Sequence, residues 1–345
     1  MKTLSIIAAA ILVGFSVNTF SDNNKAILFQ VGDGNMAVAD QSDPTIQNNL
    51  IVQAQIGTSN ESNALQITGT SNSVATHLQT GELNTSQSRQ LDTSLSSILI
   101  KQQGSMNSVF VGQFFVIESS ILTNQVGSMN SVNTGQDTVT TSNIIINQTG
   151  FMNEAPAGQS FATASSTLVH QIGSINLASI GQSEATASST LINQIGSMNF
   201  ASVGQSFDVT ASSGLIHQIG SMNFAIVSQL FDAITSTALI DQTGFMNTAG
   251  IVQFDVTTSS AFVNQVGVIN DADVRQESGT EQSIATINQI GAMNMADITQ
   301  IGAVLSNAST TQLGSDNMHI TTQTGIGQTA LVVQIGSGNM GTIIQ

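Results

Sequence analysis

Apolar and polar residues alternate with a period of two along most of the chain, and this alternation predicts short β-strands. Between Ser165 and Gln171, every second residue falls on one face of a first strand. After four residues that predict a tight turn, every second residue from Asn176 to Gln182 falls on one face of a second strand. Both segments are rich in β-branched residues, Ser, Asn and Gly, so a helix is a poor alternative.

This pair of strands belongs to a unit that recurs fourteen times. The unit is Gln-x-Gly-x-x-Asn with a second Gln eleven positions after the first, and every copy keeps all four residues. The first glutamines of the copies are Gln30, Gln55, Gln79, Gln102, Gln125, Gln148, Gln171, Gln194, Gln218, Gln242, Gln265, Gln289, Gln312 and Gln334. They advance by 304 residues in thirteen steps, a mean period of about 23 residues, which is typical of a solenoid.

All variation in copy length falls between the second Gln and the next copy, which predicts one fixed turn and one tolerant loop per copy. We therefore predict an all-β fold. It is a β-solenoid of fourteen strand-turn-strand rungs forming two facing parallel sheets, with rungs about 4.8 Å apart and sheets about 10 Å apart. The most strictly repeated faces are expected to point inward, because they press against neighbouring copies. Turn glycines such as Gly173, Gly196 and Gly220 are expected where a Cβ would obstruct the bend.

Such an inner face buries two Gln and one Asn in every rung, and a buried amide left unpaired costs about 1–3 kcal/mol. Stacking removes this cost, because each side-chain carbonyl accepts from the amide of a neighbouring rung and a continuous ladder forms. The same ladder fixes the register of the strands. In three central copies the predicted ladder residues are Gln171, Asn176, Gln182, Gln194, Asn199, Gln205, Gln218, Asn223 and Gln229. We favour this structural role over ligand recognition by the amides.

The ladders are expected to remain half-made at the two ends of the stack. The predicted end rungs contain Asn24 and Gln30 at one end, and Gln334 and Gln345 at the other. Monomeric solenoids cap their terminal repeats with a polar element, and we expect none in this chain. Because exposed strand edges are templates for another copy, we expect head-to-tail addition into an open fibre.

Composition narrows the function classes. The 345 residues include 21 acidic and 5 basic side chains, a net charge of −16, which excludes the basic surface that nucleic-acid binding requires. With no Cys, a disulfide framework and a thiolate metal site are excluded too. Lys2 and the apolar run from Leu4 to Val17 predict a signal peptide at residues 1–21, and therefore an exported, soluble mature chain.

One spacing resembles a known family. The run Ser188-x5-Gln194-x-Gly196-x2-Asn199-x-Ala201-x3-Gln205 is similar to the curlin repeat of curli fibre subunits, the functional amyloid of bacterial biofilms. The resemblance implies a secreted subunit of an extracellular fibre that serves adhesion and the biofilm matrix. It also implies export through the periplasm and an outer-membrane curli pore, and nucleation of the fibre by a minor subunit. Familiar curlins have fewer repeats and often a glycine-rich turn where this chain has Gly-Ser-Met-Asn.

A curlin-like β-solenoid is thus expected over residues 22–345, and its length and uniform repeats favour the major fibre subunit. Two alternatives remain open. One is the minor nucleator subunit of the same fibre. The other is a monomeric solenoid that binds ice or polysaccharide, which would need a flat outward array of one residue type, whereas the outward columns are mixed.

The sequence favours no enzymatic site, cofactor or metal site, because no grouping of Ser, His and acid recurs and no phosphate-binding Gly loop precedes a helix. His170 and His217 share an outward column but lie two rungs, roughly 10 Å, apart, too far for one metal ion. Acids recur in the tolerant loop, where they either repel premature stacking or line a cation-binding edge. These acids are Asp137, Glu184, Asp208, Asp232, Asp255 and Glu277.

The copies differ in regularity. Copies four to twelve, Ser96 to Gln300, are the most regular and are expected to be the best ordered. The first three copies place Gln53 and His77 on the inner face and are expected to order last. Outward positions flanking the first Gln are often apolar, which predicts side-by-side association of fibres or contact with apolar surfaces. The columns include Leu122, Leu168, Leu191 and Leu215, and then Val126, Ile172, Ile195 and Ile219.

Overall fold

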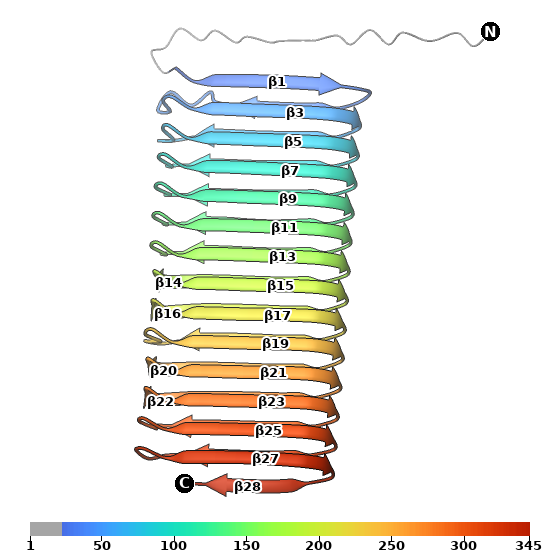
Figure 1. The fold of residues 1–345 in the computed structure, drawn as a ribbon. Helices are drawn as coiled ribbons and strands as arrows, with labels where there is room; N and C mark the ends of the chain where they lie inside the picture. Colours follow the sequence, from blue (N-terminus) through green and yellow to red (C-terminus); the bar gives the residue numbers. More distant parts are fainter. Residues whose placement is uncertain (1–22) are drawn as a thin grey trace, which may run out of the picture.

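The computed structural model describes residues 23–345, and the predicted signal peptide at residues 1–21 lies outside them. The described chain winds into a β-solenoid, which confirms the predicted fold class (Figure 1). Each turn of the solenoid is a rung, numbered by its first Gln from rung 1 (Gln30) to rung 14 (Gln334), and gives one strand to each of two sheets. No helix among these residues is long and apolar enough to cross a membrane.

Two fourteen-stranded parallel sheets form the long sides of the solenoid. Sheet A contains β1 (Lys25–Val31), β3 (Leu50–Thr58), β5 (Val74–Glu82), β7 (Ser97–Ser105), β9 (Ser120–Ser128), β11 (Asn143–Phe151), β13 (Ser166–Ser174), β15 (Ser189–Ser197), β17 (Ser213–Ser221), β19 (Thr237–Phe245), β21 (Ser260–Val268), β23 (Ile284–Ala292), β25 (Asn307–Ser315) and β27 (Thr329–Ser337). Sheet B contains β2 (Met36–Asp40), β4 (Glu61–Ile67), β6 (Thr85–Leu91), β8 (Ser108–Phe114), β10 (Ser131–Asp137), β12 (Glu154–Ser160), β14 (Leu177–Thr186), β16 (Phe200–Thr210), β18 (Phe224–Leu230), β20 (Thr248–Thr257), β22 (Asp271–Glu281), β24 (Met295–Ile301), β26 (Met318–Gln323) and β28 (Met340–Ile344).

Equivalent residues of successive rungs pair with one another in both sheets. Gln171 in β13 lies between Gln148 in β11 and Gln194 in β15, in unbroken register. The register shifts between β14 and β16 and again between β20 and β22, in each case just after the second Gln, where the copies differ in length. Side chains of one kind therefore form columns along the solenoid axis.

The segment predicted to be a tolerant loop is more regular than expected, because it forms a short third side of the rung. Single bridge pairs continue along this side through most of the rungs. In rungs 1 to 12 it also buries one small or β-branched residue, which lies three positions after the second Gln at Ala162 (after Gln159) but four positions after it at Val209 (after Gln205). The variation in length is thus absorbed in one corner, between the second Gln and this buried residue.

The apolar core between the sheets is divided. One cluster runs from Ile98 in rung 4 to Ala330 in rung 14. A smaller, separate cluster of three residues lies in rungs 2 and 3. Gln53 and His77 are buried in these two rungs, which confirms the predicted polar core of the early copies. The amide columns described below, in contrast, cross the break without interruption.

Candidate assembly surface

Two columns of glutamine run the length of the solenoid, as predicted. In the first column, Nε2 of Gln171 donates to Oε1 of Gln194 at 2.9 Å. In the second, Nε2 of Gln182 donates to Oε1 of Gln205 at 2.8 Å. The same bond joins every pair of successive rungs in both columns. The columns are therefore continuous hydrogen-bonded ladders.

Backbone carbonyls complete the pairing of each buried glutamine. The carbonyls of Glu154 and Asn176, each 3.0 Å from Nε2 of Gln171, share its second N–H. Its Oε1 accepts from the preceding rung, so both ends of the amide are paired. The cost of burying an unpaired amide, about 1–3 kcal/mol, is thereby avoided in the interior rungs.

The conserved spacing of Gly and Asn within each copy has a geometric cause. Nδ2 of Asn176 donates to Oδ1 of Asn153 and to the carbonyl of Gly196 in the next rung, both at 3.0 Å. Gly173 has φ +121°, and a Cβ on it would lie 1.9 Å from that same carbonyl oxygen. Gly220 and Gly196 also have positive φ, as predicted for turn glycines. Glycine thus leaves room for the carbonyl that the asparagine three residues later binds.

The repeated serine forms a further column whose role the sequence did not reveal. Oγ of Ser165 donates to the carbonyl of Ala185 in the next rung at 2.9 Å and accepts from the backbone N–H of Ser188 at 3.3 Å. Its recurrence six positions before the first Gln is plain in the sequence. Its partner, however, lies on the third side of the rung, whose course the repeat does not specify.

The ladders have a direction. Both glutamine columns donate toward the C-terminal end of the stack, as Gln171 does to Gln194. The asparagine column donates toward the N-terminal end, as Asn176 does to Asn153. Because no step in either kind of column reverses this direction, the two ends of the stack present different groups.

The predicted end-rung residues lie on these two faces. In rung 1, Nε2 of Gln30 and of Gln41 donates to the next rung, and no donor among residues 23–345 reaches the Oε1 of either side chain. In rung 14, Nε2 of Gln334 and of Gln345 donates to backbone carbonyls at 3.0 and 3.2 Å, respectively, without the glutamine partner that interior rungs have. Rung 1 thus offers glutamine acceptors, and rung 14 offers glutamine donors.

Asparagine supplies the complementary groups. Among the described residues, Oδ1 of Asn339 in rung 14 accepts no hydrogen bond, whereas interior residues such as Asn317 accept from the next rung at 2.7 Å through this atom. In rung 1, Nδ2 of Asn35 donates to backbone carbonyls but has no asparagine partner within residues 23–345. Asn24 is already engaged, because its Oδ1 accepts from the backbone N–H of Asn49 at 3.0 Å.

Rung 3 has a polar core instead of an apolar one. The ring of His77 lies 2.9 Å from Oγ of Ser62, 3.0 Å from Oγ of Ser86 and 2.7 Å from Oγ of Ser88. Burial of this imidazole lowers its pKa to about 3. In rung 2, Nε2 of Gln53 donates to the Val38 carbonyl at 2.9 Å, and its buried Oε1 has no partner in the described residues.

Charged groups are dispersed over the outer faces. No group of three or more His, Asp and Glu side chains in residues 23–345 is placed to hold a metal ion. His170 and His217 lie in one outward column with Asn193 between them, as predicted. Loss of hydration, and then repulsion from Asp271 and Asp297, raise the pKa of Asp273.

No protein-family model and no curated protein matches the chain. The resemblance to curlins therefore rests on the spacing of Ser, Gln, Gly and Asn. Each of these four residue types has a defined hydrogen-bonding or steric role between rungs, as described above. The candidate site is therefore the pair of end surfaces, where the ladder groups of rungs 1 and 14 lack the partners that interior rungs have.

Proposed function

We propose that the protein is a secreted structural subunit that adds head to tail into extracellular, curlin-like amyloid fibres, as the major subunit. The resemblance to curlins extends this proposal to export through an outer-membrane curli pore, nucleation by a minor subunit, and a role in adhesion and the biofilm matrix. The role is structural and includes no enzymatic step, cofactor or nucleic acid. The main partner is another copy of the same chain.

The complementarity of the end rungs carries the proposal. Stacking rung 1 of one copy on rung 14 of another would place Nε2 of Gln334 and Gln345 opposite Oε1 of Gln30 and Gln41. It would also pair β1 and β2 of one copy with β27 and β28 of the other, so that both parallel sheets continue from copy to copy. The contact reproduces the bonds between interior rungs, so it repeats without closing, which makes a filament.

Contacts between like ends lack this complementarity. Two copies of rung 14 would oppose glutamine donors to glutamine donors and asparagine acceptors to asparagine acceptors. Two copies of rung 1 would oppose glutamine acceptors to glutamine acceptors. Each buried group left unpaired in this way costs about 1–3 kcal/mol. Apolar side chains at the C-terminal edge, including Leu331 and Ile335, each 70% exposed, give the head-to-tail contact an apolar component as well.

The first experiment follows the purified chain without residues 1–21 over several hours. We expect unseeded fibres that bind thioflavin and diffract with the spacing of about 4.7–4.8 Å that stacked strands produce. A chain that remains monomeric would contradict the proposal. Binding of such a monomer to ice or to polysaccharide would favour the monomeric alternative instead.

A variant tests the end contact itself. Gln334→Glu with Gln345→Glu replaces both donors of rung 14 by carboxylates, which would face the glutamine oxygens of rung 1. We expect elongation from preformed seeds to slow at least about tenfold, since the loss of 1.4 kcal/mol already corresponds to a factor of ten. Gln103→Glu adds a charge at an exposed position in β7 and is the control. Equal elongation by the two variants would contradict the head-to-tail contact.

A further inference from the structure

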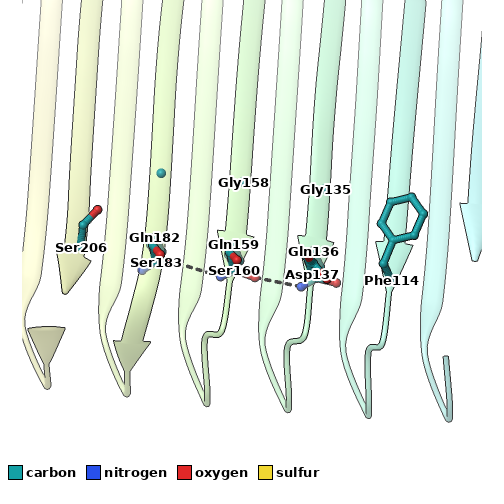
Figure 2. Close-up of a pocket in the computed structure, with 11 residues that line it drawn as sticks. Phe114, Gly135, Gln136, Asp137, Gly158, Gln159, Ser160, Gln182, Ser183 and Ser206 are labelled. Atoms are coloured by element: carbon teal, nitrogen blue, oxygen red, sulfur yellow. Dashed lines mark hydrogen bonds between the residues drawn. The ribbon is translucent and has the colours of Figure 1, made fainter. Parts of the chain in front are cut away.

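Sheet B has a recess on its outer face, away from the ladders. The residue immediately before the second Gln is glycine in rungs 4 to 8, and the glycines of successive strands pair directly. A Cβ built on Gly158, Gly181 or Gly204 would meet no atom within 4 Å. We call the hollow lined by Gly135, Gly158 and Gly181 the glycine recess, and its volume is about 510 Å³ (Figure 2). Gly204 continues the same row of glycines in the next strand.

The recess has definite boundaries. At rung 4 the ring of Phe114 lies over Gly112, where it would contact a Cβ at 2.7 Å, and the guanidinium of Arg89 lies 5.6 Å from the ring centroid. Figure 2 shows Phe114 at one end of the row and Ser206 at the other, with Ser160 and Ser183 between them. Serine side chains and the carboxylate of Asp137 therefore line the recess, and an aromatic side chain closes one end.

The outer face of sheet A carries a ridge of large side chains instead of a recess. In the column three positions before the first Gln, large aliphatic side chains follow one another in rungs 4 to 10. This leucine ridge consists of Leu99, Leu122, Ile145, Leu168, Leu191, Leu215 and Leu239. None of these side chains is buried, and Leu168 is 37% exposed.

We propose that the leucine ridge of one copy packs into the glycine recess of a second copy, so that fibres associate side by side through unlike faces. Both surfaces are built from stacked strands and share one repeat of about 4.8 Å. Each ridge side chain can therefore lie opposite one glycine of the recess. The ridge spans rungs 4 to 10 and so covers all the rungs of the recess. Contact between two ridges would oppose leucine to leucine, and contact between two recesses would leave a void.

The area available is sufficient for a specific contact. Five strands of sheet B, each about 23 Å long and spaced about 4.8 Å apart, present roughly 550 Å² per copy. Two such faces bury roughly 1,100 Å², near the lower limit for a specific interface. In a fibre the same contact recurs with every subunit, so a weak single contact becomes a strong lateral one.

The inference rests on the proposed function, because fibres are what present the two faces repeatedly. Its test fills the recess with Gly158→Thr, Gly181→Thr and Gly204→Thr in one chain. The same outward position already carries Thr299 and Thr322 in rungs 12 and 13, so it accommodates this residue. We expect unchanged thioflavin kinetics and at least a fivefold fall in the fraction of fibres found in bundles by electron microscopy.

Two matched variants complete the design. Leu168→Thr, Leu191→Thr and Leu215→Thr remove the middle three side chains of the ridge, at a position that already carries Thr76 and Thr286, and should also reduce bundling. Ser228→Thr with Val252→Thr alters the same column outside the recess and should leave bundling within twofold of the parent. Normal bundling by the recess-filled chain would overturn the inference.

Cross-linking tests which faces meet. The chain has no Cys, so Leu168→Cys and Gly158→Cys can be placed in separate chains, mixed, and oxidised with copper phenanthroline. Random pairing of equal amounts gives twice as much mixed disulfide as either homodimer. We therefore expect at least about a sixfold excess of the mixed disulfide, and a smaller excess or a dominant ridge homodimer would overturn the inference. If no fibres form at all, the head-to-tail proposal fails, and the cross-link yield between soluble chains still decides the lateral contact.

Discussion

Rungs 3 and 4 are neighbours with the same ladders and different cores. Rung 4 buries Ile98, Ile100, Val109 and Val111, whereas at the equivalent positions rung 3 buries Ala75, His77, Ser86 and Ser88. The glutamine and asparagine columns pass through both rungs with the same bonds. The comparison separates two roles: the amides fix the register, and the large aliphatic side chains supply most of the burial free energy.

Breaking the ladders in a rung with an apolar core should have the largest effect. In rung 8, Gln194→Leu with Gln205→Leu leaves four neighbouring glutamines without a ladder partner, two above and two below. At about 1 kcal/mol or more for each unpaired group, the free energy of unfolding should fall by about 4 kcal/mol. Urea denaturation of freshly prepared monomer measures it.

The control replaces neighbours that point outward, Asn193→Leu with Ser202→Leu, and should cost less than about 1 kcal/mol, as surface substitutions do. The ladder pair should also slow fibre formation more than this control. Equal effects of the two pairs would mean that the apolar core alone fixes the rung and that the ladders add nothing.

Gly196→Ala tests the turn in the same regular region. Its Cβ would lie 1.8 Å from the carbonyl oxygen of Gly220, and φ is already +127°. We expect a loss of about 3 kcal/mol from strain and displaced backbone, measured by denaturation of the monomer. Gly336→Ala in rung 14 is the control, because φ is +108° but the nearest atom lies 3.9 Å away, and it should cost only about 1 kcal/mol.

Acid should weaken rung 3 by about 3 kcal/mol between pH 7 and pH 4. Burial lowers the pKa of His77 from 6.5 to about 3, so the unfolded chain binds the proton first. Stability from the neutral imidazole is therefore complete above pH 6.5 and is lost as the pH falls toward 3. Hydrogen exchange of the amides in β4, β5 and β6 at the two pH values measures this loss. Unchanged protection there at pH 4 would contradict the assignment.

Giving rung 3 the core of rung 4 should remove the difference between them. His77→Ile with Ser86→Val and Ser88→Val copies Ile100, Val109 and Val111 and removes His77 together with two of the three serines that contact it, so that only Ser62 loses its partner. We expect about 2 kcal/mol more protection of rungs 2 and 3 against hydrogen exchange, from the apolar area gained, and no loss of protection at pH 4. His77→Ile alone is the comparison, because it leaves three buried hydroxyls without their partner and should stabilise less.

Most of the fold could be predicted from the sequence, because its residues specify contacts that recur. The residues equivalent to Gln171, Asn176 and Gln182 recur at fixed spacing in every copy. This spacing predicts the strands, the inward faces of the strands and the ladders. The buried residues of the third side, such as Val139, Ala162 and Val209, could not be predicted. Their distance from the second Gln varies, and any small or branched residue fits.

The candidate site was predicted in part, for a similar reason. The end rungs and the turn glycines follow from the repeat, but the direction of the ladders does not, since it depends on which way each amide is turned. The glycine recess was also missed. Gly158 and Gly181 lie at the outward position immediately before the second Gln, and the equivalent residues are Arg89 in rung 3 and Val252 in rung 10. Because the residue type at this position changes between copies, it gives no periodic signal.

The smallest expected effect is a pH response at rungs 11 and 12 opposite in sign to that at His77. Loss of hydration raises the pKa of Asp271, Asp273 and Asp297, and for Asp273 repulsion from the other two raises the pKa further. For a carboxyl with a raised pKa, the added stability is complete below the unfolded value of 3.8 and is lost as the pH rises through the folded value. Protection of amides in β22 and β24 should therefore increase from pH 7 to pH 4, while protection in β4, β5 and β6 decreases. Asp273→Asn with Asp297→Asn should reduce the gain in β22 and β24 to the part that Asp271 contributes and leave the loss around His77 intact. A parallel decrease in both regions would show that acid weakens the ladders themselves.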